Sequence, residues 1–568
     1  MNKQIIECVP NFSEGRDLDK IRQITDSVTK IKGVKLLNVD PGKATNRTVV
    51  TFIGDPESVI EAAFRAIKKA SEIIDMRLHH GEHPRMGATD VCPLVPISNI
   101  SMEEVVEYAH ALGYRVGEEL GIPGYYYEYA AKIPTRRNLA YCRSGEYEGL
   151  RKKLQEPGWE PDFGPSQFNA RTGATAIGAR DFLVAYNINL NTTSTRRANA
   201  IAFDIREKGR IKRKGDPLTG DIEKDKKGNP VYIPGSLKNV KGIGWYIEEY
   251  GIAQLSLNLT NINETPIHIA FDEACRCADA RGIRVTGSEL VGLVPLKALL
   301  DAGKYFLRKQ QRSLGIPEYE IIRIAIKSLG LDDLAPFNPN ERIIEYMLED
   351  KTESNLILKS LKDFVELTAS ESPAPGGGSV SACVGALGSA LGTMVANLSA
   401  HKRGWDDQWE IFSGLAEKGQ EILNKLLYLV DEDTRAFDAI IQAMRLPKST
   451  DQDREIRRKT IETATKNAIE VPFKVLKLAF SSMDLLKQMA EIGQESSVSD
   501  IGVGIACART AILGAYLNVK INCQDLSDKK YTKKILTESS TIKDQAIAME
   551  SMILKIVENK IEKKNRNE

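Results

Sequence analysis

The sequence predicts an α/β region followed by an all-α region. From Lys3 to Val285, short runs rich in β-branched residues alternate with segments of helical apolar periodicity. From Leu356 onward the strand-like runs disappear and long helical patterns replace them. A chain of 568 residues has room for about three or four domains of roughly 150 residues each.

The α/β region repeats one order of elements, β-α-β-β-α-β. We predict its first set of strands at Lys3–Val9, Val34–Val39, Thr48–Gly54 and Val91–Ile97, with helices at Leu18–Ile31 and Ser58–Ile74. A helix over Met102–Leu120 and a strand over Tyr125–Tyr129 follow. The second set has strands at Phe182–Leu190, Gly242–Glu248, Ala253–Leu259 and Ile283–Val285, with helices at Ser194–Glu207 and Pro266–Ala280. No residue-level repeat is detectable, so we predict two ferredoxin-like α+β subdomains, residues 1–178 and 179–335.

A connecting segment, residues 336–355, ends in the polar run Lys351–Asn355, and residues 356–568 are predicted to form a helical bundle. The predicted helices are Leu356–Thr368, Ser379–Ser399, Trp405–Met444, Asp453–Leu486, Val498–Val519 and Asp544–Glu562. Ser372–Ala400 carries no charge and is long enough to span a bilayer. Because its residues are mostly small, we favour a closely packed helix of a bundle over a membrane span.

The bulk properties are those of an ordinary globular protein, with 42% apolar and 27% charged residues. The net charge of +1 gives no general attraction to nucleic acid or membranes. The eight cysteines have no paired spacing, which indicates reduced thiols, and Glu7 interrupts any signal-peptide core. We therefore expect a cytoplasmic protein. The Lys-, Gly- and Asp-rich stretch Lys208–Gly235 fits a solvated loop or hairpin, or a basic arm for a polyanionic substrate tail.

The stretch Leu78–Ile97 contains His79, His80 and His83, half of the six histidines. Gly81, Pro84 and Gly87 make its first part a loop that leads into a strand. An imidazole held there can act as acid or base near neutral pH. A surface loop with bystander histidines is the alternative. A zinc site is a weaker rival, because no CxxC pair accompanies the histidines.

Two further candidates lie in the same region. Asp40 ends a predicted strand, and Arg47 follows the next turn, so they can bind a cationic group and a carboxylate. Asp40 can equally be a residue that only shapes its turn. The loop Asp162–Gly173 joins the two subdomains, where a flat ligand can lie against Phe163 or Phe168, although the pattern alone also fits a linker.

In the all-α region, position 433 falls on an apolar stripe of the helix Trp405–Met444. The stripe consists of Leu426, Val430, Phe437, Ile440, Ile441 and Met444. Asp431 and Glu432 lie off it. A buried Asp433 is either half of a structural pair or a proton-transfer group. Gly377, Gly378 and Ser379, at the start of another helix, can form an anion site or simply a flexible helix start. They are not a P-loop, since the Gly-Lys-Ser/Thr ending is absent.

At these residues the chain resembles the bifunctional formimidoyltransferase–cyclodeaminase family of folate-dependent histidine degradation. The matching sequence motifs span nearly the whole chain. In the α/β region they are ECVPNFSEGR, TNRTVVTFIG, GEHPRMGATDVCPLVP, PDFGPSQF, GIGWYIEE and GSELVGLVPLKALLDA. ERIIEY, APGGGSV, VDEDTRAF, RLPK and GAYLNVKIN follow in the same order.

The resemblance implies that residues 1–335 transfer a formimidoyl group between N-formimidoyl-L-glutamate and tetrahydrofolate, with His83 as acid/base. It implies a helical module that cyclises 5-formimidoyltetrahydrofolate to 5,10-methenyltetrahydrofolate and releases ammonia, with Asp433 as the catalytic carboxylate. The folate-binding stretch that it implies is Gly164, Pro165, Ser166, Gln167, Phe168, Asn169, Ala170, Arg171, Thr172 and Gly173.

Tetrahydrofolate, with a polyglutamate tail, is the expected co-substrate, no metal is required, and a homo-oligomer such as a ring-like octamer of dimers is expected. The sequence departs from the family pattern at Lys208–Gly235, which is longer, and at Gln494–Asp500, so contacts there are not carried over. A scaffolding protein, or an enzyme with one active module, is the alternative to two active modules.

Overall fold

The computed structural model describes residues 4–42, 46–80, 84–216, 219–348 and 355–567. Two units are distinct in it. The first, here called the α/β unit, is Met1–Ala298 with Leu329–Glu349. The second, the helical unit, is Leu299–Ser328 with Asp350–Glu568.

The first part of the α/β unit is built on a seven-stranded sheet with the order β1-β4-β2-β5-β7-β6, and β3 pairs with β4. Its strands are β1 (Ile5–Cys8), β2 (Asn11–Phe12), β3 (Val34–Gly42), β4 (Arg47–Gly54), β5 (Thr89–Ser98), β6 (Gly124–Glu128) and β7 (Thr175–Ala179). The pairs among β1 to β5 are antiparallel, whereas β7 lies parallel to both β5 and β6.

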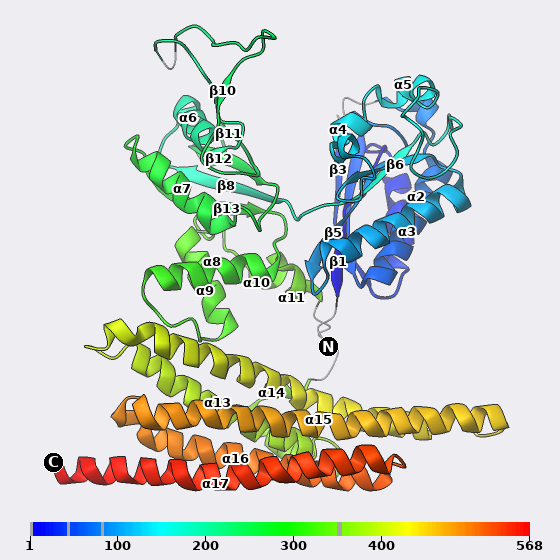
Figure 1. Cartoon of the computed structure of the whole chain (residues 1–568). Coiled ribbons are helices and arrows are strands. Elements are labelled where there is room, and N and C mark those ends of the chain that lie inside the picture. The colour runs from blue at the N-terminus through cyan, green and yellow to red at the C-terminus, as the bar shows by residue number, and fades with distance from the viewer. Residues whose placement is uncertain (1–3, 43–45, 81–83, 217–218, 349–354, 568) are drawn as a thin grey trace. The chain divides into compact units, whose positions relative to one another are not determined.

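Helices α1 (Leu18–Thr29), α2 (Pro56–Ile73) and α3 (Met102–Leu120) cover one face of this sheet, as Figure 1 shows for α2 and α3. Their apolar residues recur at helical spacing and face Ile6, Phe52 and Leu94 of the strands. The helix starts follow from local chemistry, because the Asp55 side chain caps α2 and a Ser101–Glu104 capping box opens α3.

The opposite face of the sheet carries a second, smaller core under the short helices α4 (Leu139–Cys142) and α5 (Glu146–Lys153). Successive residues of β6 alternate between the two cores: Tyr126 packs with the helices of the first face, and Tyr125 and Tyr127 pack with the second. The loops that carry the predicted transferase residues border this second core.

The second part of the α/β unit is a four-stranded sheet with the order β11-β12-β8-β13. Its strands are β8 (Val184–Leu190), β11 (Val240–Ile247), β12 (Ile252–Leu259) and β13 (Val285–Val291), with helices α6 (Thr195–Ile205) and α7 (Ile267–Asp279). In both sheets the first strand of the β-α-β-β-α-β order lies between the third and the fourth. Within the predicted insertion, β9 (Arg210–Ile211) and β10 (Tyr232–Ile233) pair antiparallel at the base of an extended arm (Figure 1).

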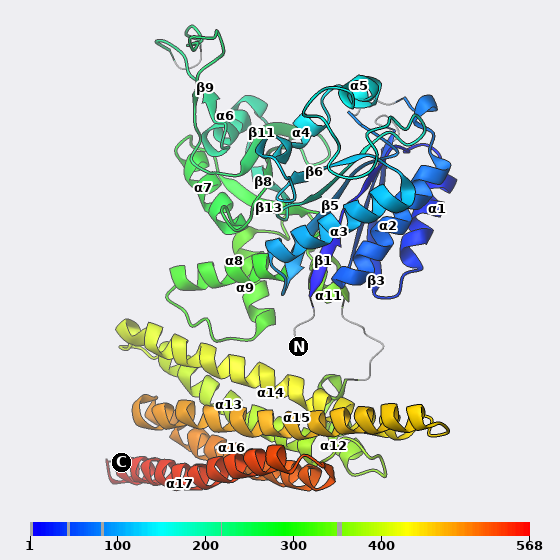
Figure 2. The same ribbon diagram turned by 45° about the vertical axis from the view of Figure 1, so that its right-hand side comes forward.

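Four helices connect the sheets to the bundle: α8 (Leu296–Lys309), α9 (Glu318–Leu329), α10 (Pro339–Arg342) and α11 (Ile344–Leu348). The bundle consists of α12 (Leu361–Thr368), α13 (Gly377–Ala400), α14 (Trp409–Met444), α15 (Asp451–Ile492), α16 (Val498–Asn522) and α17 (Lys529–Asn567). Figure 2 shows the longer helices lying side by side, and α13 packs against α14, α15 and α16. Its small residues permit this, since a Cβ on Gly388 would come within 2.8 Å of the Gly504 carbonyl oxygen.

Two helices, Gly377–Ala400 and Glu495–Asn522, are long and apolar enough to cross a membrane by length and composition alone. The most apolar window of the first is 61% buried inside the protein and that of the second 44%. Core helices of bundles pass the same test, so this finding is weak support for a membrane span.

The mixed α/β region followed by a helical region is confirmed, and several bounds differ from those predicted. β3 continues past Asp40 to Gly42, so Asp40 lies within the strand and not at its end. β13 begins where the predicted strand stops, and α17 begins at Lys529 and not at Asp544. The strands β2 and β7 and the helices α4 and α5 had no counterpart in the prediction.

Candidate active sites

The histidine loop of the α/β unit connects α2 to β5. After the short turn Met76–Leu78, the chain passes His79 and His80, and Gly81–His83 lie outside the described residues, so the structure gives no position for His83. The loop is held where it meets the sheet. The Ser13 hydroxyl donates to the Gly87 carbonyl at 2.7 Å, and the Ser13 amide donates to Ala88 at 2.9 Å.

The predicted folate-binding stretch 164–173 lies directly against the histidine loop. The amide of Met76 donates to the Arg171 carbonyl at 2.9 Å, and that of Ala88 donates to Thr172 at 2.8 Å. The chains come so close that a Cβ on Gly173, which has φ +67°, would lie 2.1 Å from the Met86 carbonyl oxygen. The structure thus brings together two stretches that are far apart in the sequence.

The two phenylalanines proposed to lie against a flat ligand have different surroundings. Phe163 is buried in the helix-covered core, 5.0 Å from the Tyr126 ring, which leaves it no face for a ligand. Phe168 is partly buried, with Tyr147 at 5.7 Å and the Arg151 guanidinium 5.2 Å from its ring centre. Of the two, Phe168 is the candidate for stacking.

The residues that precede the stretch 164–173 are held by a buried ion pair and by hydrogen bonds. Arg136 and Asp162, each almost fully buried, form an ion pair at 2.7 Å, and Asp162 also accepts from the Tyr126 amide at 2.9 Å. Arg136 donates further to the carbonyls of Gly158 and Glu160. Because both charges are paired and bonded, the loop leaves the sheet from a fixed point.

A group of charges surrounds Arg47. Asp90 is fully buried, accepts from the Met86 amide at 3.0 Å and pairs with Arg143. Burial and the nearby Arg143 lower the pKa of Arg47, while Asp90 and Asp40 act in the opposite sense. Two guanidinium groups near one another suit a substrate carboxylate. Asp40 is exposed on β3 and contributes to this field.

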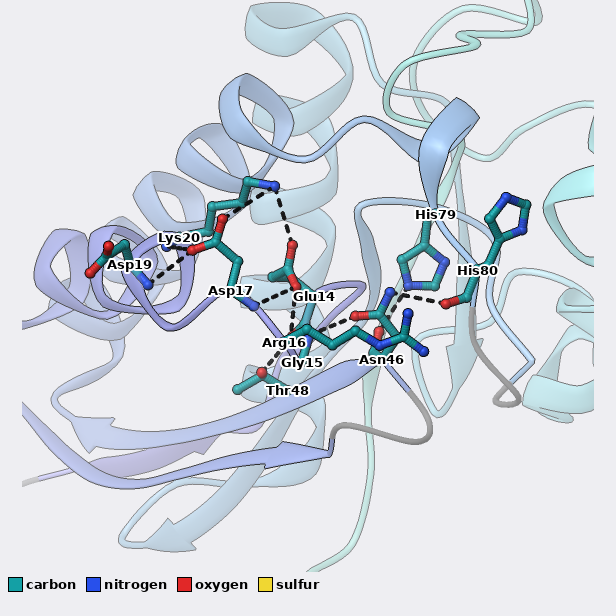
Figure 3. Close-up of polar contacts among 10 residues, drawn as sticks. All are labelled: Glu14, Gly15, Arg16, Asp17, Asp19, Lys20, Asn46, Thr48, His79 and His80. Atoms are coloured by element: carbon teal, nitrogen blue, oxygen red, sulfur yellow. Dashed lines mark hydrogen bonds and ion pairs between the residues drawn. The ribbon is translucent and has the colours of Figure 1, made fainter.

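Asn46 was missed at the sequence level, although it organises the loop (Figure 3). It sits at φ +48° and accepts from the Gly15 amide at 3.0 Å through its side-chain oxygen. Its side-chain amide donates to the His80 carbonyl at 3.0 Å, and its own carbonyl contacts the His79 ring at 2.8 Å. The available signal was the unusual word TNRT, in which asparagine tolerates the left-handed conformation.

In the helical unit, Asp433 and the glycine-rich start of α13 form one site. The Ser379 amide donates to Asp433 Oδ2 at 2.8 Å, and the Ser379 hydroxyl lies 3.1 Å from the same oxygen. A Cβ on Gly378 would lie 2.1 Å from Asp433 Oδ1. The anion at this helix start is therefore the protein's own carboxylate. Burial raises the pKa of Asp433, and the two bonds from Ser379 act to lower it.

The predicted stripe of α14 is wrong at Phe437 and Met444, whereas Ile440 packs against the core. Phe437 and Met444 are 40% and 51% exposed, because the buried line continues through Ala436 and Ala443. Asp433 borders this line and is partly buried. Asp431, predicted to lie off the stripe, is only 6% exposed, since its carboxylate accepts the Leu356 amide at the start of a 3₁₀ turn, Leu356–Leu358. Burial raises the pKa of Asp431 as well.

Within the described residues, no group of three or more His, Cys, Asp or Glu is placed to hold a metal ion. Zinc binding by the histidine loop stays a prediction, since His83 lies outside the described residues.

These two candidate sites, one beside a histidine loop and one around a partly buried carboxylate, lie in different units of the chain. Residues 5–180 match the family described as "Formiminotransferase domain, N-terminal subdomain", and residues 185–349 match "Formiminotransferase domain". Residues 360–541 match "Formiminotransferase-cyclodeaminase".

Similar proteins cover either the whole chain or one unit. Formimidoyltransferase-cyclodeaminase of Gallus gallus is 43% identical over 558 residues, 98% of this chain and 99% of the relative. Glutamate formimidoyltransferase of Thermoplasma acidophilum is 44% identical over 54% of this chain and 92% of its own length. Methenyltetrahydrofolate cyclohydrolase of Methylorubrum extorquens is 32% identical over 36% of this chain and 98% of its own. The chain belongs to the formimidoyltransferase–cyclodeaminase family.

Proposed function

We propose that this chain, a formimidoyltransferase and cyclodeaminase by family, carries out both reactions at the two sites described above. The α/β unit transfers a formimidoyl group between N-formimidoyl-L-glutamate and tetrahydrofolate. The helical unit converts 5-formimidoyltetrahydrofolate to 5,10-methenyltetrahydrofolate and ammonia. The observation that carries the proposal is the joining of candidate residues at each site: the histidine loop against residues 164–173, and Asp433 against Ser379.

In the transfer step, an amine attacks the amidine carbon and a tetrahedral intermediate forms, which then loses the other nitrogen. His83 takes the proton from the incoming amine and returns one to the leaving nitrogen. This role rests on the family resemblance. The pair Arg47 and Arg143 supports binding of the glutamate carboxylates, and Asp40 favours the cationic amidinium.

In the cyclodeaminase step, nitrogen-10 of the folate attacks the same carbon, and ammonia leaves. Asp433 accepts the proton from nitrogen-10 and delivers one to the departing amine. A carboxylate whose pKa is raised by burial, yet which is held in place by Ser379, suits both transfers.

The folate position and tail belong to the same proposal. Residues 164–173 bind the pterin part, with Phe168 as a stacking surface. A cavity of about 430 Å³ in the α/β unit is lined by three cationic side chains, Arg137, Arg180 and Lys241, and by two acidic ones, Glu128 and Asp181. The excess of positive charge supports binding of the carboxylates of a polyglutamate tail there. The basic arm 208–235 is a further contact for such a tail. We also propose that both sheets with their helices are ferredoxin-like, on the strand order that they share.

The oligomeric state and the cellular location of the protein also belong to this proposal. α13 and α16 expose apolar side chains that a second copy of the chain would cover: Leu387, Leu398, Val503, Leu517 and Ile521. This supports the expected homo-oligomer, and the scattered cysteines support a reducing, cytoplasmic environment.

A second candidate activity for the helical unit is hydrolysis of the methenyl product, because the similar Methylorubrum extorquens protein bears the name of a cyclohydrolase. The two candidates differ in the fate of methenyltetrahydrofolate. A cyclodeaminase accumulates its absorbance, whereas a cyclohydrolase removes it.

The test uses the whole chain with tetrahydrofolate and formimidoylglutamate, followed by methenyltetrahydrofolate absorbance and ammonia release. His83→Ala should abolish glutamate-dependent transfer and leave cyclisation of supplied 5-formimidoyltetrahydrofolate. Asp433→Asn should do the reverse. Loss of both activities in each variant would contradict the two-site assignment, and a wild-type chain inactive in both assays would favour a scaffolding role.

A further inference from the structure

The His79 imidazole uses both of its ring nitrogens within the protein. Nε2 lies 2.8 Å from the Asn46 carbonyl oxygen (Figure 3). The Arg85 Nε–H donates to Nδ1 at 3.3 Å. An arginine Nε always carries its hydrogen, so Nδ1 must be the unprotonated nitrogen. Nε2 therefore carries the ring proton and donates it to Asn46. These two contacts define one neutral tautomer.

The surroundings favour the neutral ring. His79 is 7% exposed, and burial together with the positive charge of Arg85 lowers its pKa. The hydrogen bond with the Asn46 carbonyl acts in the opposite sense on this pKa, as does Glu14, whereas Arg16 lowers it further. Glu148 is a further charged group that interacts with the ring. Protonation would place a second positive charge against Arg85 and remove the acceptor of its Nε–H. These contacts favour a neutral ring that donates through Nε2 and accepts through Nδ1 within the protein.

The partners of His79 are themselves fixed. Asn46 is bonded to Gly15 and to the His80 carbonyl, which ties His79 and His80 to the start of β4. Arg85, also 7% exposed, forms ion pairs with Glu146 at 3.1 Å and with Glu148 at 2.6 Å, both in α5.

The described residues on either side of Gly81–His83 are held by hydrogen bonds. His79 and His80 precede these three residues, and Arg85 and Met86 follow them. The His79–Arg85 contact joins the two sides directly. The Met86 amide, bonded to Asp90, fixes the second side to β5.

We propose that His79 is a positioning residue of the transferase, a neutral imidazole that joins Asn46 to Arg85 as a clamp and so holds the described residues on either side of His83. This inference rests on the proposed function of His83. His80 contributes its backbone carbonyl, and its ring points away from these contacts in Figure 3. The clamp also assigns different tasks to the three histidines of the loop.

The test compares His79→Gln with His79→Leu. Glutamine supplies one N–H for the Asn46 carbonyl and one oxygen for Arg85, whereas leucine supplies neither. Because a displacement of about 1 Å at a reacting group costs about 100-fold in rate, we expect transferase kcat to fall about 100-fold in His79→Leu. We expect it to stay within about fivefold of wild type in His79→Gln, with an unchanged pH profile. His80→Leu is the matched control and should stay within about twofold.

Cyclisation of supplied 5-formimidoyltetrahydrofolate by the same chains reports the integrity of the helical unit and should not change. If His79→Gln were as inactive as His79→Leu and lost one limb of the pH profile, His79 would itself be the acid/base and the clamp would be refuted. Full activity of His79→Leu would refute it equally.

Hydrogen–deuterium exchange measures how firmly the loop around His79 is held and does not require catalysis. Its result is therefore independent of the proposed function. Faster exchange of Met76–Asp90 in His79→Leu, and wild-type exchange in His79→Gln, would support the clamp even if no transfer were detected. Wild-type exchange in both variants would overturn it.

Discussion

Replacement of Gly378 by alanine tests the cyclodeaminase site with a single methyl group. The added Cβ would lie 2.1 Å from Asp433 Oδ1, and real Cβ contacts essentially never fall below 3.0 Å. The carboxylate must therefore move by about 1 Å, which costs about 100-fold in the rate of a step that depends on its position. The obstacle is the end of a side chain, so the fold can adapt. Alanine also favours the helix by up to about 1 kcal/mol, and no loss of stability is expected.

The assay is cyclisation of supplied 5-formimidoyltetrahydrofolate, with glutamate-dependent transfer as an internal control that should not change. Gly376→Ala is the matched variant, because a Cβ at Gly376 meets nothing within 4 Å. We expect kcat to fall about 100-fold in Gly378→Ala and to stay within about twofold in Gly376→Ala, with similar thermal unfolding of the two. Near-normal cyclisation by Gly378→Ala would refute the reasoning, and so would an equal loss in Gly376→Ala.

Three further predictions concern pH and stability. Ser379→Ala removes a hydrogen bond that lowers the pKa of Asp433, so the acid limb of cyclodeaminase kcat/KM should move to higher pH, and an unmoved limb would contradict this role. Burial raises the pKa of Glu7 from 4.5 to about 7, so its contribution to stability is complete below about pH 4.5 and is lost as the pH rises through 7. Glu7→Gln should therefore stabilise the protein by about 3 kcal/mol above pH 7 and little at pH 4, and an equal gain at both pH values in thermal unfolding would oppose this. Arg136→Leu leaves Asp162 buried without its partner and should cost about 3–5 kcal/mol in denaturant unfolding, whereas a cost below about 1 kcal/mol would show that the pair is unimportant.

Helices and strands with a strong apolar periodicity in the sequence could be predicted. Elements that are defined by contacts with distant segments of the chain could not. The amphipathic helices α1 to α3 and the β-branched strands β4 and β12 lie close to their predicted bounds. β7 has the sequence TAIGA, in which alanine and glycine give little strand signal, and pairing with β5 and β6 on either side defines it. The start of α17 is rich in lysine and threonine, so packing and not local pattern decides where that helix begins.

The residues of the candidate sites also divide into those that the sequence could predict and those that it could not. Residue type and spacing led to the histidine loop and to Asp433, because rare histidines and a carboxylate beside an apolar line are visible in a sequence. They did not lead to Asn46, which looks like any polar turn residue until the chain folds. Nor could they show that Asp431 is buried, since its partner Leu356 lies 75 residues away.

The backbone bonds between the histidine loop and residues 164–173 have a consequence for how a bound folate is sensed. Two chain segments that share successive main-chain hydrogen bonds move as one rigid body, and either can be displaced only by breaking those bonds. If residues 164–173 bind the pterin ring as proposed, a ring that contacts Phe168 acts on a segment that is bonded through its backbone to the histidine loop. Substitutions in residues 164–173 are then expected to change turnover as well as affinity.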